Sequence, residues 1–240
     1  MNLSPRLEAV AAFVPTGSRV LDVGTDHGYL PIALLQRGVA SSAIASDVRP
    51  GPLEQARANA RAAGLEDRVD LRLGSGLAVA RPGEADVAVL AGMGGLLILS
   101  LLEAAPEAVR AARRLILAPN TKVAQVRRWA SLHRFRFVGE DLVAEGRHLY
   151  AILALVPGPS DEAPLSDIEA ELGPLLLRQA HPLLPDLIGR LITSDRLALH
   201  ALRPGETEGR DPRRQSREDA LRRRRDALEE VLRCWPKWPT

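Results

Sequence analysis

The amino-acid sequence predicts a doubly wound α/β domain, built on a seven-stranded sheet whose last strand is antiparallel, followed by a C-terminal α-helical hairpin domain. Two observations support this fold class. Short β-type runs alternate with helical segments between residues 19 and 156, as βαβ units require. Beyond residue 156 the strand signal stops and apolar residues recur at helical spacing. We therefore place one domain at residues 1–157 and a second at residues 161–240.

The first domain contains five short apolar runs, each followed by a turn or a helical stretch. A sixth and a seventh run are joined directly by Ala144-Glu145-Gly146-Arg147, which predicts an antiparallel hairpin. The predicted strands are Arg19–Val23, Ser42–Ser46, Val69–Leu73, Asp86–Leu90, Arg114–Leu117, Phe135–Val143 and His148–Val156.

Helical patterns precede and separate these strands. Leu3–Val14 predicts a short amphipathic helix, and Pro52–Ala63 predicts another that ends at Gly64, a residue favoured at helix C-termini. The leucines at positions 96, 97, 101 and 102 form a stripe with helical spacing. Such a stripe favours a core-facing helix over a binding surface.

The second domain is predicted to be entirely helical. Pro157–Ser160 has the composition of a linker, and Ile168–Leu202 has helical spacing that its internal prolines must break. Arg203-Pro204-Gly205 predicts a turn, after which Arg213–Leu232 forms another helix. Two helices joined in this way most simply form an antiparallel hairpin.

The composition excludes several classes of protein. The single cysteine, Cys234, can form neither an intramolecular disulfide nor a multi-thiolate metal site, and the five histidines are scattered, so we expect no metal. The N-terminus lacks the apolar core of a signal peptide, and no apolar run is long enough to span a bilayer. We expect a cytoplasmic protein with no membrane partner, and a monomer is the favoured state.

The net charge of the chain does not identify its partners. The formal net charge is only +2, and the basic residues are arginines except for Lys122 and Lys237. Arginine binds phosphate groups bidentately, which suits RNA. A run such as Arg222–Arg225 is more often a solvated helix face than an RNA site. Charge alone therefore leaves contact with RNA open.

The segment from Val20 to Leu30 has the pattern of a ligand-binding turn. An apolar strand runs into Gly24 and Gly28 and then into a helix, as in the first turn of a nucleotide-binding sheet. Asp26 occupies the place of the second glycine of a dinucleotide fingerprint, where an acid would repel a pyrophosphate. S-adenosylmethionine instead carries an ammonium and a sulfonium, which Asp22 and Asp26 can favour. The turn therefore predicts S-adenosylmethionine as the cofactor.

The following strands end in further candidate residues. Asp47 ends the second predicted strand, where a carboxylate can accept both ribose hydroxyls of an adenosine, although it can also merely cap the next turn. The third strand ends in glycines beside the expected adenine pocket, and the fourth ends in Ala-Gly-Met. All of these lie at the carboxyl ends of parallel strands, where ligands bind. The predicted cofactor-binding residues are Asp22, Gly24, Thr25, His27, Gly28, Asp47, Val48, Gly74, Ser75, Gly76, Ala91, Gly92 and Met93.

These residues lie within longer strings that resemble the bacterial tRNA (adenine-22-N1) methyltransferases over nearly the whole chain. The strings Thr25-Asp26-His27 and Ala91–Gly95 are specific, and further matches occur at Leu3–Leu7, Leu115–Asn120 and Gly173–Leu176. The resemblance implies a class I, Rossmann-like methyltransferase fold with a coiled-coil-like C-terminal domain. It also implies transfer of a methyl group from S-adenosylmethionine to N1 of an adenine in the D-arm region of tRNA.

The implied reaction needs little proton transfer, because N1 of neutral adenine has a lone pair that attacks the sulfonium methyl directly. The Watson–Crick edge must be exposed, so the base must be unpaired or extruded. We assign Asp26 and Asn120 as the catalytic residues. Asp26 accepts from the adenine amino group or stabilises the developing positive charge, and Asn120 hydrogen-bonds the base. The alternative for Asp26 is a structural or cofactor-binding carboxylate.

Two residues depart from the family pattern, and the fold leaves other functions open. Ser75 stands where an acid is expected in a Gly-Asp-Gly turn, and Asp47 replaces a frequent glutamate. The fold does not choose the substrate. The alternatives are a methyltransferase acting on another RNA or a small molecule, a nicotinamide-dependent reductase, and a non-catalytic RNA-binding module.

Overall fold

The computed structural model describes residues 2–158, 164–202 and 212–235. The chain divides into two units, Met1–Pro164 and Leu165–Thr240. This division falls a few residues after the predicted end of the first domain at residue 157. Two of the sequence predictions lie outside the described residues. They are Pro159 and Ser160 of the predicted linker and the predicted turn Arg203-Pro204-Gly205.

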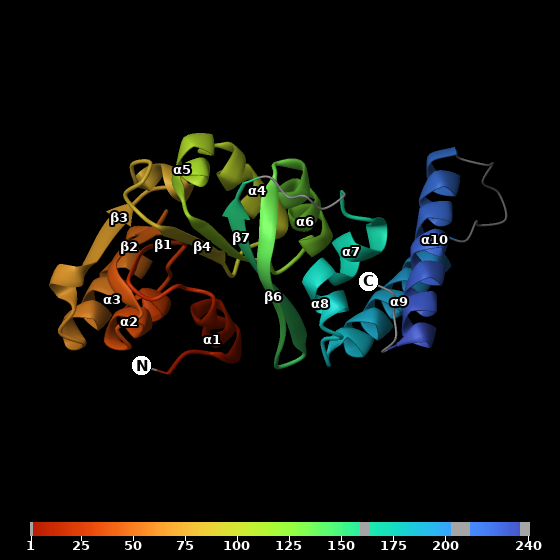
Figure 1. Cartoon of the computed structure of the whole chain (residues 1–240), viewed down its shortest axis with the longest axis horizontal. Coiled ribbons are helices and arrows are strands. Elements are labelled where there is room, and N and C mark those ends of the chain that lie inside the picture. The colour runs from red at the N-terminus through yellow and green to blue at the C-terminus, as the bar shows by residue number, and fades with distance from the viewer. Residues whose placement is uncertain (1, 159–163, 203–211, 236–240) are drawn as a thin grey trace. The chain divides into compact units, whose positions relative to one another are not determined.

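Unit 1 contains a seven-stranded sheet in the order β3-β2-β1-β4-β5-β7-β6 (Figure 1). Only β7 runs antiparallel to its neighbours β5 and β6, which confirms the predicted sheet with its last strand reversed. Each observed strand lies within a few residues of its prediction. The strands are β1 (Ser18–Val23), β2 (Ala40–Asp47), β3 (Val69–Leu73), β4 (Val87–Ala91), β5 (Arg114–Ala118), β6 (Phe135–Glu145) and β7 (His148–Pro157).

The strand order places a topological switch point at β1, which pairs in parallel with β2 on one side and β4 on the other. The chain connections leave β1 in opposite directions on its two sides, so a crevice opens beyond its carboxyl end. Ligands of doubly wound sheets bind in such crevices.

Helices cover both faces of the sheet (Figure 1). The first three cover one face, and α4 to α6 cover the other. Between them the strands bury an apolar core that contains Val89, Ile116 and Ile152 at 0% exposure. The helices are α1 (Pro5–Ala12), α2 (Tyr29–Gln36), α3 (Pro50–Ala62), α4 (Gly95–Glu103), α5 (Pro106–Ala111) and α6 (Val123–Leu132), with 3-10 turns η1 (Glu66–Arg68) and η2 (Gly76–Val79).

The N-terminal helix α1 is held by contacts with distant residues. An eight-residue helix is marginal by itself, although Ser4 caps it by accepting a hydrogen bond from Leu7 N at 3.4 Å. The ring of Phe13 lies against Gly139 of β6, where no Cβ would fit. Nη1 of Arg114 donates to the Phe13 carbonyl at 2.8 Å. The position of α1 therefore depends on β5 and β6.

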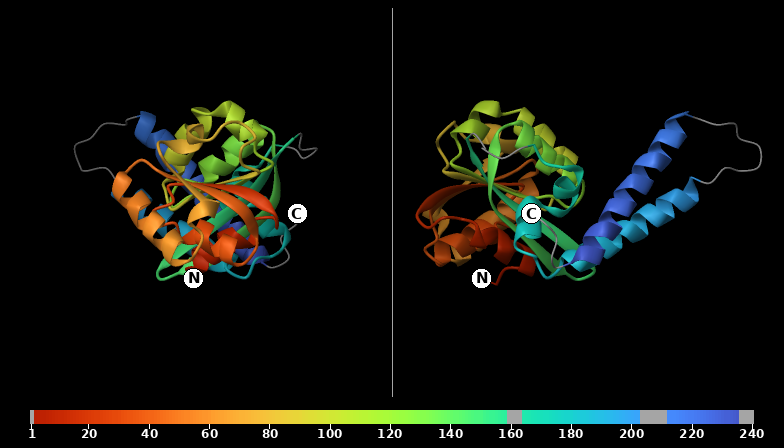
Figure 2. Two further views of the ribbon diagram at one scale, coloured as in Figure 1. Left: turned by 90° about the vertical axis from the view of Figure 1, so that its left-hand side faces the viewer. Right: turned by 45° about the vertical axis from the view of Figure 1, so that its right-hand side comes forward.

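Unit 2 is helical, as predicted, and contains α7 (Asp167–Leu172), α8 (Pro174–Arg178), α9 (Leu184–Ala201) and α10 (Pro212–Cys234). The predicted helical stretch 168–202 is thus three helices. It breaks at Gly173, whose φ is +102°, and again before α9 at the prolines. Helices α9 and α10 pack side by side as a hairpin (Figure 2). In the ranges that the structure describes, no helix combines the length and apolarity needed to cross a bilayer.

Candidate functional site

A cavity of about 610 Å³ lies at the carboxyl edge of the sheet, around the switch point at β1. Its walls come from the segments that follow β1, β2, β3 and β4. The predicted site residues that line it are Asp22, Gly24, Thr25, Asp26, Asp47, Val48, Gly74, Ser75, Gly76, Ala91, Gly92 and Met93.

The turn after β1 is fixed by backbone hydrogen bonds to the neighbouring strand. The N–H groups of Gly24 and Thr25 both donate to the carbonyl of Ser46, at 2.8 and 2.9 Å. Gly24 has a φ of +72°, and a Cβ there would lie 3.0 Å from Cε of Met93. Only glycine both adopts this backbone conformation without strain and leaves this wall of the cavity open.

Asp26 adopts a left-handed backbone conformation with a φ of +53°. It occupies the place of the second glycine of a dinucleotide fingerprint and has a backbone conformation typical of glycine, which Asp tolerates better than most residues. Its side chain is 62% exposed and lines the cavity, and its Oδ2 lies 3.6 Å from Nε2 of His27. A strained residue at a cavity wall is a mark of a functional site.

His27 and Gly28 do not line the cavity but shape the turn that forms it. The carbonyl of His27 accepts a hydrogen bond from Nδ2 of Asn59 in α3 at 2.9 Å. Gly28 precedes α2 with a φ of +72°, and a Cβ there would lie 3.0 Å from Cβ of Ala56. Glycine at this position therefore permits the close packing of α2 on α3.

Asp22 is a buried acid at the floor of the cavity, with 5% of its surface exposed. Burial raises the pKa of its carboxyl to about 6, and the neighbouring Thr25 side chain works in the opposite direction. Burial therefore disfavours the charged form of the Asp22 carboxyl, and a nearby cation would favour it. A cationic ligand would supply the missing counter-charge.

Asp22→Asn should raise the free energy of unfolding of the ligand-free protein at pH 8 by up to about 3 kcal/mol, because the folded state no longer ionises a buried acid. The folded pKa lies above the unfolded one, so this acid's penalty is absent below about pH 4 and grows as the pH rises through 6. Urea denaturation at pH 8 and pH 4 measures the difference. Equal stabilisation at both pH values would contradict the assignment to charge.

Asp47 makes the turn-capping contact that its position allowed. Its Oδ1 accepts a hydrogen bond from the backbone N–H of Arg49 at 2.9 Å, and its side chain is nearly buried. The residue also lines the cavity at the end of β2. Turn capping therefore does not exclude a role toward a ligand, since a carboxylate has further acceptor sites.

The cavity also includes residues that the sequence did not assign to a site: Val23 of β1, Arg6 and Leu7 of α1, Tyr29 and Leu30 of α2, Arg49, and Leu97 and Leu101 of α4. The interpretation of the leucine stripe as core was wrong in part. Leu102 is buried, but Leu96 is 58% and Leu97 51% exposed. Leu97 and Leu101 line the cavity, because α4 begins at the carboxyl edge of the sheet, whereas Ile98 of the same helix is buried.

Asn120, at the end of β5, lies beside the cavity in a network with Arg6 and Gly92. Its Nδ2 donates to the carbonyl of Gly92 at 2.8 Å, and its Oδ1 accepts from Nη1 of Arg6 at 3.1 Å. The Arg6 guanidinium also lies 4.9 Å from the centre of the Tyr150 ring, and its backbone N–H donates to Glu145 at 3.0 Å.

Metal chemistry finds no support in the part of the chain that the structure describes. No three side chains of His, Cys, Asp or Glu gather there in a way that could hold a metal ion. His27 is instead beside Asp26 and tilted against the ring of Tyr29, with the two ring centres 5.4 Å apart. The absence of a metal stays a prediction.

Known proteins resemble this chain over most of its length. A family model described as a methyltransferase domain matches residues 3–153. The tRNA (adenine(22)-N(1))-methyltransferase of Bacillus subtilis (strain 168) is 37% identical over 163 residues, which is 68% of each protein. The crystal structure of the B. subtilis m1A22 tRNA methyltransferase has a TM-score of 0.87 at 28% identity, covering 96% of this chain and 99% of that one. A Streptococcus pneumoniae protein crystallised with S-adenosyl-L-methionine has a TM-score of 0.84 at 34% identity, covering 96% of this chain and 100% of that one.

Proposed function

The chain belongs to the family of tRNA (adenine(22)-N(1))-methyltransferases, and from that membership we propose the roles of the residues around its cavity. The enzyme transfers the methyl group of S-adenosylmethionine to N1 of adenine 22 in tRNA. The observation that best supports the site assignment is that four consecutive parallel strands deliver their carboxyl ends to one cavity with buried acids in its wall. We also propose that the enzyme works in the cytoplasm, with its tRNA substrate.

The residues present fit S-adenosylmethionine. Asp22 and Asp47 are acids that the protein buries at the cavity, and a cofactor with an ammonium and two ribose hydroxyls matches their charge and acceptor capacity. The glycine at position 24 leaves the space that a Cβ would fill. We assign Asp22 to the cationic end of the cofactor and Asp47 to its ribose. When bound, the cofactor supplies an electrophilic methyl group on a sulfonium.

Asp26 is the group we assign to the reacting base. Its carboxylate is at the cavity wall and largely exposed, so it is accessible to an extruded adenine. Methylation at N1 gives a cationic ring, and a nearby carboxylate stabilises positive charge as it develops. No residue has to remove a proton first, because N1 attacks with its own lone pair. The chain's task is to hold the base in line and to favour the cationic product.

The experiment that tests this function compares two tRNA transcripts that differ only at position 22. With labelled methyl donor, the transcript with adenine 22 should accept about one methyl group, and reverse transcription should stop beside position 22. A transcript with guanine 22 is the matched control and should accept none. Label in both transcripts, or a stop elsewhere, would overturn the assignment of the methylated atom. If free adenosine is supplied in place of tRNA, incorporation of label into it would favour a small-molecule substrate.

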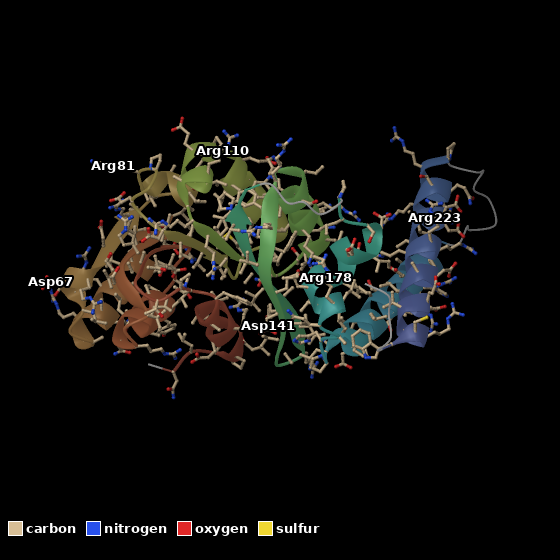
Figure 3. The ribbon with its side chains drawn as sticks, in the orientation of Figure 1. Asp67, Arg81, Arg110, Asp141, Arg178 and Arg223 are labelled. Atoms are coloured by element: carbon tan, nitrogen blue, oxygen red, sulfur yellow. The ribbon has the colours of Figure 1, made fainter. Side chains whose placement is uncertain are left out.

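Unit 2 carries the charge that we assign to tRNA docking. On α10, Arg217, Arg223 and Arg233 make no ion pair within the described residues and are exposed; Arg223 is labelled in Figure 3. By contrast, Arg222 is paired with Glu218 at 2.6 Å. We propose that residues 1–157 hold the cofactor and that residues 161–240 bind the tRNA backbone.

Arg223→Gln should weaken tRNA binding and lower the slope of log Kd against log salt concentration by about 1, because one phosphate contact is lost. Arg222→Gln is the matched control, since its arginine is already engaged by an acid on the same helix. Filter binding at several salt concentrations gives both slopes, and calorimetry should show unchanged cofactor affinity. Identical slopes for the wild type and Arg223→Gln would remove this residue from the RNA surface.

A further inference from the structure

The side-chain amide of Asn120 is held in one orientation by its two neighbours. Its Nδ2 donates to the Gly92 carbonyl, and its Oδ1 accepts from Arg6. A guanidinium can only donate and a carbonyl can only accept, so turning the amide over would break both hydrogen bonds. The orientation is therefore imposed by the chemistry of the partners.

Arg6 is itself well anchored. Its guanidinium lies 4.9 Å from the Tyr150 ring centre, and its backbone N–H donates to Glu145 at 3.0 Å. A Cβ at Gly92 would lie 3.7 Å from Nη1 of Arg6, which places the guanidinium directly over the cavity wall that follows β4. An anchored donor fixes its acceptor better than a mobile one, because less side-chain entropy is lost in the contact.

The two hydrogen bonds use half of the amide's capacity. A carboxamide has two N–H donors and two acceptor lone pairs. One of each is engaged, so one donor and one acceptor remain on a residue that is exposed beside the cavity. This is the pair with which an asparagine recognises adenine, by accepting from the N6 amino group and donating to N7.

We propose that Asn120, oriented by Arg6, recognises the target adenine through N6 and N7 and so leaves N1 unobstructed for methyl transfer. This inference rests on the proposed function and deepens it. Guanine presents two acceptors at the same edge, O6 and N7, and the amide acceptor has no donor to meet there. The contact therefore both orients adenine and selects it over guanine. Asn120 touches the base, whereas Arg6 is a positioning residue that acts through Asn120.

The test removes one substrate atom and one side chain in turn. Single-turnover methylation is measured on tRNA with adenine 22 and on the same tRNA with 7-deazaadenine 22, which lacks the N7 acceptor. The ratio of the rate with adenine to the rate with 7-deazaadenine should be about three- to tenfold larger for the wild type than for Asn120→Ala, because only the wild type loses a hydrogen bond to N7. The substitution also changes the intrinsic reactivity of N1, but this effect occurs with every enzyme and cancels in the comparison of ratios.

Arg6→Met should give the same adenine to 7-deazaadenine ratio as Asn120→Ala, because the side-chain amide of Asn120 is no longer oriented by Arg6. The matched control is Arg37→Met. Arg37 also binds α1, through paired hydrogen bonds to Glu8 at 2.7 and 2.6 Å, but it does not contact Asn120. Arg37→Met should therefore keep the wild-type ratio. Thermal melting verifies that each variant is folded, and Arg6→Lys, which keeps the charge but not the guanidinium geometry, replaces Arg6→Met should it not fold.

The possible outcomes separate this inference from the proposed function. Failure of the wild type to methylate unmodified tRNA at position 22 would overturn the function itself. If the wild type methylates unmodified tRNA normally but has the same adenine to 7-deazaadenine ratio as Asn120→Ala, the contact of Asn120 with N7 is refuted and the proposed function is not. A wild-type ratio in Arg6→Met would leave Asn120 as the base contact and would refute the positioning role of Arg6.

Discussion

Replacing Asp26 with asparagine is expected to slow methyl transfer by about 10- to 1000-fold, equivalent to about 1.4–4 kcal/mol. The change removes the negative charge that would stabilise the cationic methyladenine and keeps the shape of the side chain. Asparagine is also well tolerated at the φ of +53° that this position requires, so the turn after β1 should persist. Single-turnover rates at saturating cofactor and tRNA measure the chemical step.

Asp47→Ala is the matched control for this experiment, since it removes a different acid from the same cavity. Loss of the assigned ribose contact should weaken S-adenosylmethionine binding at least about tenfold. At saturating cofactor, however, the single-turnover rate should stay near that of the wild type. A normal rate in Asp26→Asn would end its catalytic assignment. A large loss of cofactor affinity in Asp26→Asn would instead place Asp26 on the cofactor.

The largest expected effect on stability belongs to Glu140 of β6. Its Oε1 lies 2.8 Å from Nε of Arg127 in α6, and the two side chains are 0% and 1% exposed. Glu140→Gln should lower the free energy of unfolding by about 3–5 kcal/mol, because it removes the carboxylate charge that faces the buried arginine. Urea denaturation followed by far-ultraviolet circular dichroism measures this change.

The double variant Arg127→Met/Glu140→Leu is the informative control for the buried pair. Apolar side chains of similar size remove both charges together, so its unfolding free energy should lie much closer to that of the wild type. A double variant as unstable as Glu140→Gln would contradict the explanation by loss of one charge from a buried ion pair. The loss would then come from packing between α6 and β6.

The architecture of unit 1 could be predicted from the sequence because its signals are local. Each strand is a short apolar run, and the hairpin at Gly146 joins two such runs directly. The breaks within residues 168–202 were expected in kind, but their positions depend on a glycine at 173 with a φ of +102° as well as on the prolines. The place of α1 could not be predicted, because Phe13 meets Gly139 from a distant part of the sequence.

The site divides in the same way. Residues such as Gly24 and Asp47 were found because the carboxyl ends of parallel strands converge by a general rule of the fold. Arg6 had no such rule, and only its place in a family-like string gave a signal. Leu97 was misassigned because helical spacing shows which residues share a face, but not whether that face meets the sheet or extends beyond it. Side chains brought in by packing between distant elements therefore need the structure.

The docking of α1 against β5 and β6 also fixes the order in which the enzyme can be completed during synthesis. Arg6 emerges from the ribosome early, but its backbone partner Glu145 lies 139 residues later in the chain. At about 5–20 residues per second, this interval takes roughly 7–30 seconds. The turn after β1 and its neighbour β2 are made long before that. In a nascent chain the turn after β1 can therefore form before α1 is docked, and the part of the cavity wall that Arg6 contributes is completed only after β6 has been translated.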